Sequence, residues 1–403
     1  MHKYATLITQ GNELTTGSIL DTNAQWLAAQ LTDHGWTIRA ILTLPDDCDA
    51  LMQYFKAETH HSDVIISAGG LGPTSDDHTR EAFSQAFSIA LIQNEEAMTH
   101  IQNHCKRRQR PFTEQLSIMA QLPEGSSLIP NEYGSAVGFK ALIGTCSFFA
   151  LPGVPSELKH MFLNNILPTL DKGNINLQKR FLCFGPPESE LQTRLQSLNL
   201  SDYNIGYRAT RTGNIIKLYG PPLTDSLLHQ LRLLLKDCCI AEDEEDMAIA
   251  IGQQLTENKE TVATAESCTA GRVAAWLARI PGASAYLLEG VVVYANEAKQ
   301  KYTGVRTETL QHYGAVSPQT AIELAQGIRD TAQSTWGISV TGIAGPGGGT
   351  PQKPVGTVHI AVAGPNGILK HRHLQLHGER TEITLSSAAH LLFLLHQARQ
   401  ELS

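Results

Sequence analysis

Hydrophobic positions near the N-terminus alternate between short continuous runs and runs with helical spacing. The segments KYATLITQG, WTIRAILTL and SDVIISAGG are typical of strands, and two of them end in glycine. Between them, TNAQWLAAQLTDHG and DALMQYFKAE carry apolar residues three or four positions apart, as a helix does. A repeated strand–helix–strand order predicts a doubly wound, mostly parallel sheet with helices on both faces. Ligands of such sheets bind beyond the carboxyl ends of the strands.

The hydrophobic pattern changes near Lys179. The following segments indicate the order strand, helix, strand, strand, helix, and the acidic stretch AEDEEDMA then marks a boundary. From about Met247 strands and helices alternate again, and a glycine-rich loop separates the strands WGISVTG and VGTVHIAVAG. We therefore predict a small α+β middle domain over 171–245 and an α/β domain over 246–403.

Composition excludes several classes of protein. The chain has 403 residues, of which 42% are hydrophobic, and such a chain forms two or three globular domains. A net charge of -8 argues against nucleic acid as a partner, and the short basic run KRRQR at 106–110 is interpreted as a solvated helix end.

Targeting signals and cysteines add to this picture. The N-terminal residues do not have the pattern of a signal peptide, and apolar runs such as HLLFLLH are too short to cross a membrane. The seven cysteines form neither a CxxC pair nor an even disulfide framework. We expect a reduced, cytoplasmic, enzyme-like protein without membrane partners.

The segment TAESCTAG places Ser267 and Cys268 where a strand gives way to a helix. Free backbone N–H groups and the positive end of the helix dipole suit a serine that caps the helix, but also an anionic ligand or an oxyanion. These residues alone favour a simple cap, since serine is a common N-cap. Cys268 is expected to pack in the core.

Three further segments carry candidate chemistry. Tyr294 and Lys299 follow a strand, and Lys299 could act as a base only if burial or a neighbouring cation lowered its pKa. By itself such a lysine is more often a solvated helix residue. Thr341 ends a strand before a loop with five glycines, whose backbone could approach a phosphate, and Arg380 near the last helix could hold an anion.

Together these segments resemble a known family. In order and spacing, AESCTAG, VVVYANEAKQKYTGV, YGAVSPQTAIELAQGI, VTGIAGPGGGTPQKPVGTVHIAV and HGERTEI resemble the C-terminal domain of the CinA family, the nicotinamide mononucleotide deamidases. The resemblance implies hydrolysis of the substrate carboxamide to the acid, with release of ammonia, by a Ser/Lys pair and without a cofactor.

The resemblance also implies roles for individual residues. Ser267 matches the nucleophile and would also start the helix, and Lys299 matches the base and would be buried and neutral. Tyr294 and Thr341 match residues that assist at the acyl centre. Arg380 would meet the substrate phosphate. The remaining substrate contacts are expected from Thr269, Gly342, Ala344 and Gly345.

One position in this region departs from the family pattern. Ala270 stands where the family usually carries glycine. We expect its methyl group to tighten the helix start without abolishing activity.

The N-terminal segment SAGGLGPTSDDHTREAF opens a helix after a strand. Asp76, Asp77 and Thr79 could cap this helix or bind a metal-phosphate group, and capping is the commoner role of such residues. With TQGNELTTGSILDTNAQWLAAQL, NEYGSAVGF and LPGVPSELKHM, the segment resembles the molybdopterin-binding-like domain of CinA proteins over residues 1–170, and the middle part resembles their linking domain.

That domain is associated with divalent-metal-dependent hydrolysis of ADP-ribose. The resemblance implies a nucleotide site with Asp77 as a metal ligand and, around it, Glu13, Asn12, Asn23, Gly70, Gly72 and Thr79. Three positions of the presumed pocket depart from the family: Asn12 replaces aspartate, Ile118 lysine and Met119 glutamine. The domain is therefore either a hydrolase or only a nucleotide-binding or dimerisation module. The resemblance also suggests a homodimer.

Overall fold

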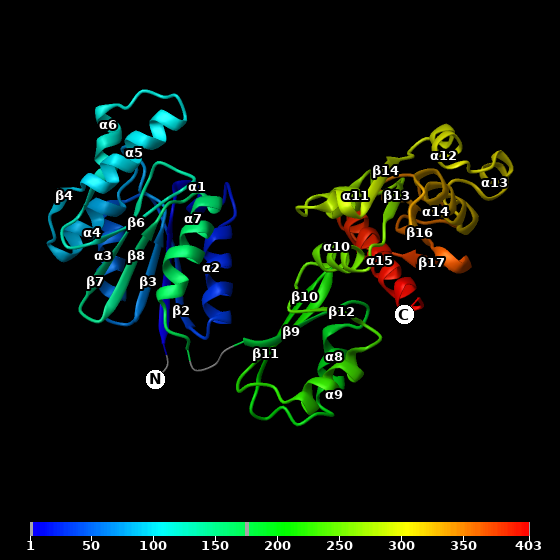
Figure 1. The fold of residues 1–403 in the computed structure, drawn as a ribbon, viewed down its shortest axis with the longest axis horizontal. Coiled ribbons are helices and arrows are strands. Elements are labelled where there is room, and N and C mark those ends of the chain that lie inside the picture. Colours follow the sequence, from blue (N-terminus) through cyan, green and yellow to red (C-terminus); the bar gives the residue numbers. More distant parts are fainter. Residues whose placement is uncertain (1–2, 174–176, 403) are drawn as a thin grey trace. The chain divides into compact units, whose positions relative to one another are not determined.

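The computed structural model describes residues 3–173 and 177–402 and divides the chain into two compact units, Met1–Leu177 and Gln178–Ser403 (Figure 1). The domain boundaries at 170 and 245 stay predictions. No helix within the described ranges is both long enough and apolar enough to cross a bilayer.

The first unit is built on a six-stranded sheet. Its strands, in spatial order, are β2 (Thr37–Leu44), β1 (Tyr4–Gln10), β3 (Val64–Ala68), β8 (Cys146–Leu151), β7 (Gly138–Ile143) and β6 (Ser127–Ile129). The first four run parallel, β7 pairs antiparallel with β8, and the edge strand β6 pairs antiparallel with β7. The remaining elements are α1 (Asn12–Thr15), α2 (Thr22–Asp33), α3 (Cys48–Glu58), α4 (Thr79–Phe87), β4 (Leu91–Gln93), α5 (Glu95–Arg107), α6 (Glu114–Ser117), β5 (Gln121–Pro123) and α7 (Pro155–Met161).

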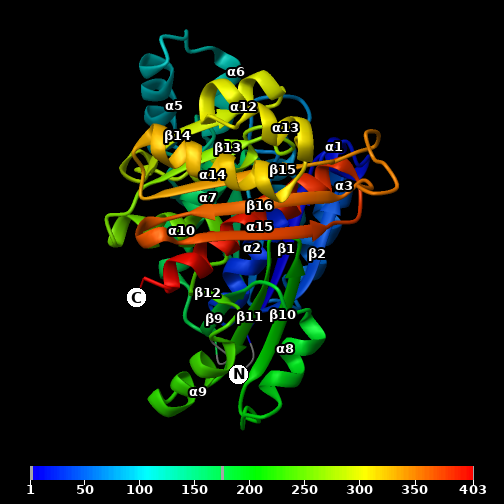
Figure 2. The ribbon, with the colours of Figure 1, turned by 90° about the vertical axis from the view of Figure 1, so that its right-hand side faces the viewer.

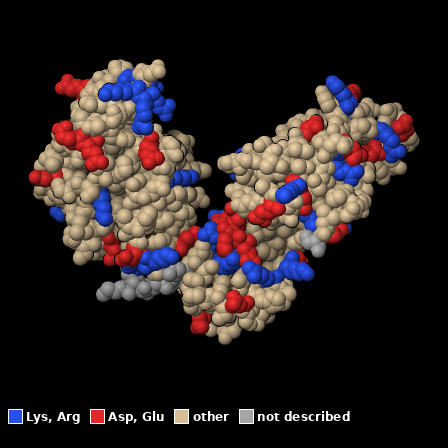
Figure 3. Space-filling view, in the orientation of Figure 1, with Lys and Arg blue, Asp and Glu red and all other residues tan. Residues whose placement is uncertain are grey.

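Helices cover both faces of this sheet, as the hydrophobic pattern predicts. On one face, Leu27 and Leu31 of α2 pack with the side chains of α7. On the other face, Phe55 of α3 and Phe83 of α4 pack against Phe148 of β8, with ring centroids 4.9 and 4.8 Å away. The doubly wound arrangement is thereby confirmed. The basic run at 106–110 is exposed at the end of α5, also as predicted, and its blue side chains gather there in Figure 3.

The second unit begins with a four-stranded sheet. The chain order is β9 (Leu177–Cys183), α8 (Glu188–Leu195), β10 (Asn204–Thr210), β11 (Gly213–Tyr219), α9 (Asp225–Leu235) and β12 (Cys239–Glu242). The spatial order β10-β11-β9-β12 is that of a ferredoxin-like βαββαβ unit. Leu182 and Ile215 of this sheet join the same hydrophobic core as Ile251 of the next helix. This part of the chain therefore packs firmly on the C-terminal part.

A five-stranded sheet follows in the same unit. Its strands, in spatial order, are β14 (Leu287–Val292), β13 (Val262–Glu266), β15 (Trp336–Gly342), β16 (Thr357–Ala363) and β17 (Leu369–Gln375). The first three run parallel, β16 pairs antiparallel with β15, and β17 pairs antiparallel with β16. The helices are α10 (Met247–Glu257), α11 (Arg272–Ala278), α12 (Asn296–Thr303), α13 (Thr307–Tyr313), α14 (Pro318–Ala332) and α15 (Arg380–Gln400). Every strand and helix predicted for this region is present.

The two faces of this sheet are covered by different helices, with α14 and α15 on opposite sides (Figure 2). Strand alternation assigns the side chains of β13 to these faces. Val262 belongs to the core with α10, α11 and α15, whereas Ala263 and Ala265 belong to the core with α12 and α14. Ser267 lies two positions after Ala265, so its side chain points to the same face of the sheet, toward α12.

The start of α11 differs from the prediction. The Ser267 N–H donates to the carbonyl of Val340 at 2.9 Å and so extends the sheet, and the helix begins only at Arg272. The idea that Ser267 starts or caps the helix is therefore wrong. Ala270 has φ 52°, in the left-handed region, where an alanine costs about 1–2 kcal/mol more than in a right-handed turn. Its methyl group strains the turn instead of tightening it.

We predict that Ala270→Gly stabilises the second unit. Glycine removes the left-handed penalty but adds flexibility to the unfolded chain, so a net gain of about 0.5–1 kcal/mol is expected. This gain corresponds to a rise of about 1–4 °C in the midpoint of the unit's calorimetric transition. The matched control is Ala275→Gly inside α11, which should lower the midpoint. A fall in the midpoint with Ala270→Gly would contradict the strained turn.

Candidate functional site

Ser267 and Lys299 meet in the second unit, as predicted. Ser267 follows β13 directly, and Lys299 lies on α12, on the same side of the sheet. The Lys299 Nζ is 3.3 Å from the Ser267 Oγ. Both residues are buried, with exposed fractions of 1% for Lys299 and 8% for Ser267. The pair thus combines a hydroxyl with an amine that has almost no contact with solvent.

The surroundings of Lys299 favour its neutral form. Nζ donates to the carbonyls of Val293 at 2.8 Å and Tyr294 at 2.9 Å. Burial lowers the pKa of Lys299 because it penalises the charged amine, against small opposing contributions from Cys268 and Glu297. Among the described carboxylates, none forms an ion pair with Lys299. The burial predicted for Lys299 is confirmed.

Glu266, which the sequence analysis did not single out, organises the loop after β13. Its carboxylate is fully buried and accepts from the Thr269 hydroxyl at 2.6 Å. It also accepts from the N–H groups of Gly271, Val273 and Ala274 at 3.1, 3.0 and 2.8 Å. The donors at the start of α11 are thereby satisfied by Glu266 and not by Ser267. A buried glutamate before a serine gives no sequence signal of this role.

Tyr294 and Arg380 form a second contact pair, 86 positions apart in the chain. The Arg380 guanidinium donates to the Tyr294 hydroxyl at 2.9 Å and to the carbonyl of Gly345 at 2.7 Å. Tyr294 is more than half exposed, and its own carbonyl accepts from Lys299. Arg380 therefore links the glycine-rich loop to Tyr294, whose carbonyl accepts from Lys299. It still has guanidinium donors beyond these two bonds.

The other residues predicted for this site have structural partners. The buried Thr341 donates to the carbonyl of Ala315 at 2.7 Å, and Thr269 is bound to Glu266. Gly342 ends β15, and Ala344 packs in the hydrophobic core. Thr269 lies on the loop after Ser267, Thr341 and Gly342 end β15, and Ala344 lies on the loop that follows this strand.

Cys268 points into the core and not into the site. Its exposed fraction is 5%, and it belongs to the cluster formed with α10, α11 and α15. Burial raises the pKa of its thiol to about 12, so the thiolate is not available at neutral pH. The prediction that Cys268 is a core residue is confirmed.

The first unit has its own cavity, of about 380 Å³, beyond the ends of β1, β3 and β8. Five carboxylates line it: Glu13, Asp46, Asp76, Asp77 and Glu157. The predicted glycines Gly70 and Gly72 also line it. Burial, followed by the nearby charges of Glu13, Asp76 and Asp77, raises the pKa of Asp46. The cavity is therefore strongly acidic.

Asp77 shapes the loop that borders this cavity. One of its carboxylate oxygens accepts from the N–H of Gly72 at 2.8 Å, and the other accepts from the N–H and the hydroxyl of Thr74 at 2.9 and 2.5 Å. Behind the loop, the buried Arg80 donates to the carbonyls of Leu71 and Gly72. Both carboxylate oxygens of Asp77 thus hold the loop, which disfavours it as a metal ligand.

Three other predicted residues support the cavity wall from behind. The Asn12 N–H donates to Asp46 at 2.8 Å, and the Asn23 amide donates to the carbonyl of Gly153 at 2.7 Å. The Thr79 hydroxyl lies 2.8 Å from both the side-chain oxygen of Gln10 and the carbonyl oxygen of Gly69, within hydrogen-bond distance of each.

The three departures from the family pattern do not share one pocket. Ile118 lines a separate cavity of about 280 Å³, and Met119 is buried in the core. Asn12 instead holds Asp46 at the acidic cavity. Asp77 lines both cavities, so the two adjoin, and the effect of these departures on activity stays a prediction.

No three His, Cys, Asp or Glu side chains within residues 3–173 and 177–402 converge to hold a metal ion. Carboxylate oxygens are nevertheless the ligands that Mg²⁺ prefers, and it is commonly held by one or two of them together with phosphates of the substrate. Glu13 and Asp46 fit that chemistry at the acidic cavity.

We predict that Glu266→Gln destabilises the second unit by about 3 kcal/mol. The variant loses the negative charge, and its amide NH₂ faces backbone N–H groups that then have no acceptor. Thr269→Val removes a single donor and should cost about 1 kcal/mol. Calorimetry of both variants checks the ranking. Equal effects of the two substitutions would contradict the organising role of Glu266.

Comparisons with known proteins agree with this arrangement. Residues 244–399 match the CinA C-terminal domain model, and residues 6–172 match the model described as a probable molybdopterin binding domain. A CinA-like protein of Desulforapulum autotrophicum is 37% identical over 394 residues, covering 93% of each chain. The nicotinamide-nucleotide amidohydrolase PncC of Shewanella oneidensis is 36% identical over 372 residues, covering 90% of this chain and 88% of that relative.

Among solved structures, the competence/damage inducible protein CihA of Agrobacterium tumefaciens is 42% identical, with a TM-score of 0.38. The aligned region covers 38% of this chain and 93% of the Agrobacterium tumefaciens chain. The family models account for both ends of the chain, and the relatives align with most of its length. The chain is a member of the CinA family.

Proposed function

We propose that the second unit hydrolyses the carboxamide of nicotinamide mononucleotide and releases nicotinate mononucleotide and ammonia. The observation that carries this proposal is the buried Ser267–Lys299 pair, with 3.3 Å between hydroxyl and amine. The name of the Shewanella oneidensis relative supports the choice of substrate.

The bonds around Lys299 match the needs of a general base. A neutral amine has two N–H groups and one lone pair, and the carbonyls of Val293 and Tyr294 accept the two N–H groups. The lone pair is then left for the O–H of Ser267. Lys299 therefore needs no further partner to be oriented toward the hydroxyl.

The proposed reaction has two steps. The Ser267 Oγ attacks the carboxamide carbon while its proton moves to the Lys299 Nζ. Lys299 then gives this proton to the nitrogen as the C–N bond breaks, so that ammonia leaves and an acyl-enzyme forms. Water, deprotonated by the neutral Lys299, attacks the ester carbon, and Lys299 returns this proton to the Ser267 Oγ as the C–O bond breaks and the acid is released. Arg380 is proposed to bind the substrate phosphate with the donors that it does not give to Tyr294 and Gly345.

The nucleophile is tested by Ser267→Ala against Cys268→Ala. Ser267→Ala should lower ammonia release by at least 1,000-fold, since no other oxygen nucleophile adjoins Lys299 in the proposed mechanism. Cys268→Ala should keep kcat within about threefold, because the buried thiol faces the core. Ammonia release from purified protein, nicotinamide mononucleotide and a chelator measures both. An inactive Cys268→Ala beside an active Ser267→Ala would overturn the assignment.

The base is tested by the pH dependence of kcat/KM. The lowered pKa of Lys299 makes the neutral amine available above that pKa, so activity should rise with pH through it and be lost below it. Lys299→Arg should be inactive at every pH, because guanidinium stays protonated. Lys301→Arg, on the exposed side of α12, is the matched control and should keep the wild-type profile. A profile without this rise would contradict the role of Lys299.

A second candidate function belongs to the first unit. We propose that its acidic cavity hydrolyses ADP-ribose when a divalent cation is bound, and the observation behind this is the ring of five carboxylates. An anionic diphosphate would be repelled by these groups, so it needs a cation to enter. Glu13 and Asp46 would hold the cation, which supplies positive charge beside the phosphates. Homodimerisation stays a prediction from the family resemblance.

This candidate is tested with ADP-ribose and Mg²⁺, with release of AMP as the readout. AMP should appear only with the metal, should stop with a chelator, and should fall at least 100-fold in Asp46→Asn. The exposed Glu132→Gln is the matched control and should keep the wild-type rate. No AMP from the wild type would leave this unit as a nucleotide-binding or dimerisation module.

A further inference from the structure

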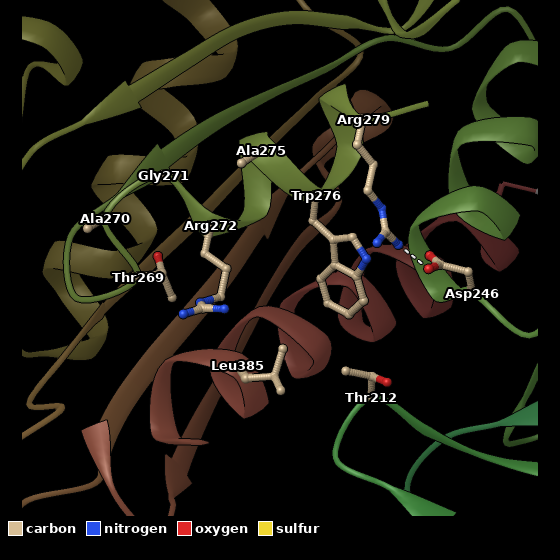
Figure 4. Close-up of a pocket in the computed structure, with 10 residues that line it drawn as sticks. All are labelled: Thr212, Asp246, Thr269, Ala270, Gly271, Arg272, Ala275, Trp276, Arg279 and Leu385. Carbon is tan, nitrogen blue, oxygen red and sulfur yellow. Dashed lines mark hydrogen bonds and ion pairs between the residues drawn. The ribbon is translucent and has the colours of Figure 1, made fainter. Parts of the chain in front are cut away.

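The second unit contains a further cavity, of about 760 Å³, beside α11 (Figure 4). It is formed by the turn between β10 and β11, the start of α10, the loop after Ser267, α11 and α15. Its lining residues are Thr212, Asp246, Thr269, Ala270, Gly271, Arg272, Ala275, Trp276, Arg279 and Leu385. This volume lies within the range of small-molecule binding sites.

The cavity is separate from the Ser267–Lys299 pair. Ser267 continues the row of Ala263 and Ala265, which faces α12 and α14, and it meets Lys299 on that side. The helices α11 and α15 cover the opposite face of the same sheet. A ligand in this cavity would touch the loop after Ser267 from behind, without taking the place of the amide.

Arg272 gives the cavity an uncompensated positive charge. Its Nε is buried, and in the described part of the chain this nitrogen has no hydrogen-bond acceptor and the guanidinium has no carboxylate partner. A guanidinium that lines a cavity without a carboxylate partner favours an anionic ligand there. Figure 4 shows the side chain extended along the cavity wall between Thr269 and Leu385.

Arg279, one helical turn further along the wall from Ala275, provides the contrast. It is paired with Asp246, and that carboxylate also accepts from the N–H groups of Ala248 and Ile249 at the start of α10. The charges of Arg279 and Asp246 therefore compensate one another. The excess positive charge of the cavity is that of Arg272.

Trp276 supplies a flat apolar surface next to this charge. Its indole is partly buried against the hydrophobic core and lies between Arg272 and Asp246 in Figure 4. The Arg279 guanidinium lies 6.0 Å from the ring centroid. An aromatic ligand could stack on such a ring, and Leu385 provides a further apolar contact on the opposite wall.

From these features we propose that the cavity binds a nucleoside monophosphate. Its phosphate would pair with Arg272, and its base would stack on Trp276. Guanidinium binds phosphate through two parallel hydrogen bonds, and base–aromatic stacking tolerates different bases. The site is distinct from both catalytic proposals and does not depend on either.

The probe for this site is AMP, which has no carboxamide and no diphosphate. Titration calorimetry with the full-length Ser267→Ala chain should show saturable binding, and adenosine should bind at least tenfold more weakly because it lacks the phosphate. Arg272→Gln should weaken AMP binding at least tenfold, and Arg272→Lys, which keeps the charge, should weaken it less. Trp276→Leu should weaken it at least threefold.

Two controls separate this cavity from the others. Arg380→Gln removes the arginine proposed to bind the substrate phosphate at the Ser267–Lys299 site and should leave the affinity for AMP within twofold. Asp46→Asn alters the acidic cavity and should also leave it unchanged. Absence of AMP binding, equal affinities of Arg272→Gln and the wild type, or loss of binding in Asp46→Asn would each overturn the proposal. Thermal unfolding of each variant verifies that it is folded.

Discussion

The burial of the Glu266 carboxylate at the end of β13 is the constraint on which the second unit depends. A charged group in the interior is stable only when donors surround it, and this one collects the Thr269 hydroxyl and three backbone N–H groups. These bonds fold the chain back toward the carboxylate and delay the start of α11 to Arg272. Ser267 is thereby kept on the sheet, with its side chain on the face of α12.

The position of Lys299 follows from the same geometry. Val293 directly follows β14, and its N–H donates to the carbonyl of Glu266 at 2.8 Å. The end of β14, where the Val293 carbonyl accepts from Lys299, is therefore bonded to the end of β13, which Ser267 follows. The amine can then be buried without a counter-ion, because two carbonyls satisfy its N–H groups. This burial makes a base out of a side chain that is otherwise protonated at neutral pH.

The acidic cavity of the first unit and the cavity beside α11 differ in charge and therefore in the ligands that suit them. The cavity of the first unit is ringed by carboxylates and suits an anion only together with a cation. The cavity behind the Ser267 loop holds one uncompensated guanidinium beside an indole and suits an anion directly. Both are lined by loops and helices that surround the sheets, so the charge of each is set by loop and helix residues and not by the strands.

The sequence by itself determined the order of strands and helices, because hydrophobic periodicity reports directly on local structure. The quoted motifs also identified Ser267 and Lys299 as candidates. Only the tertiary structure decided that two carbonyls hold the Lys299 amine, that Glu266 and not Ser267 satisfies the start of α11, and that Arg380 bonds to Tyr294. The reason is physical. Some of these contacts join residues that are distant in the chain, and others depend on the face of the sheet to which a side chain points. Local periodicity contains neither kind of information.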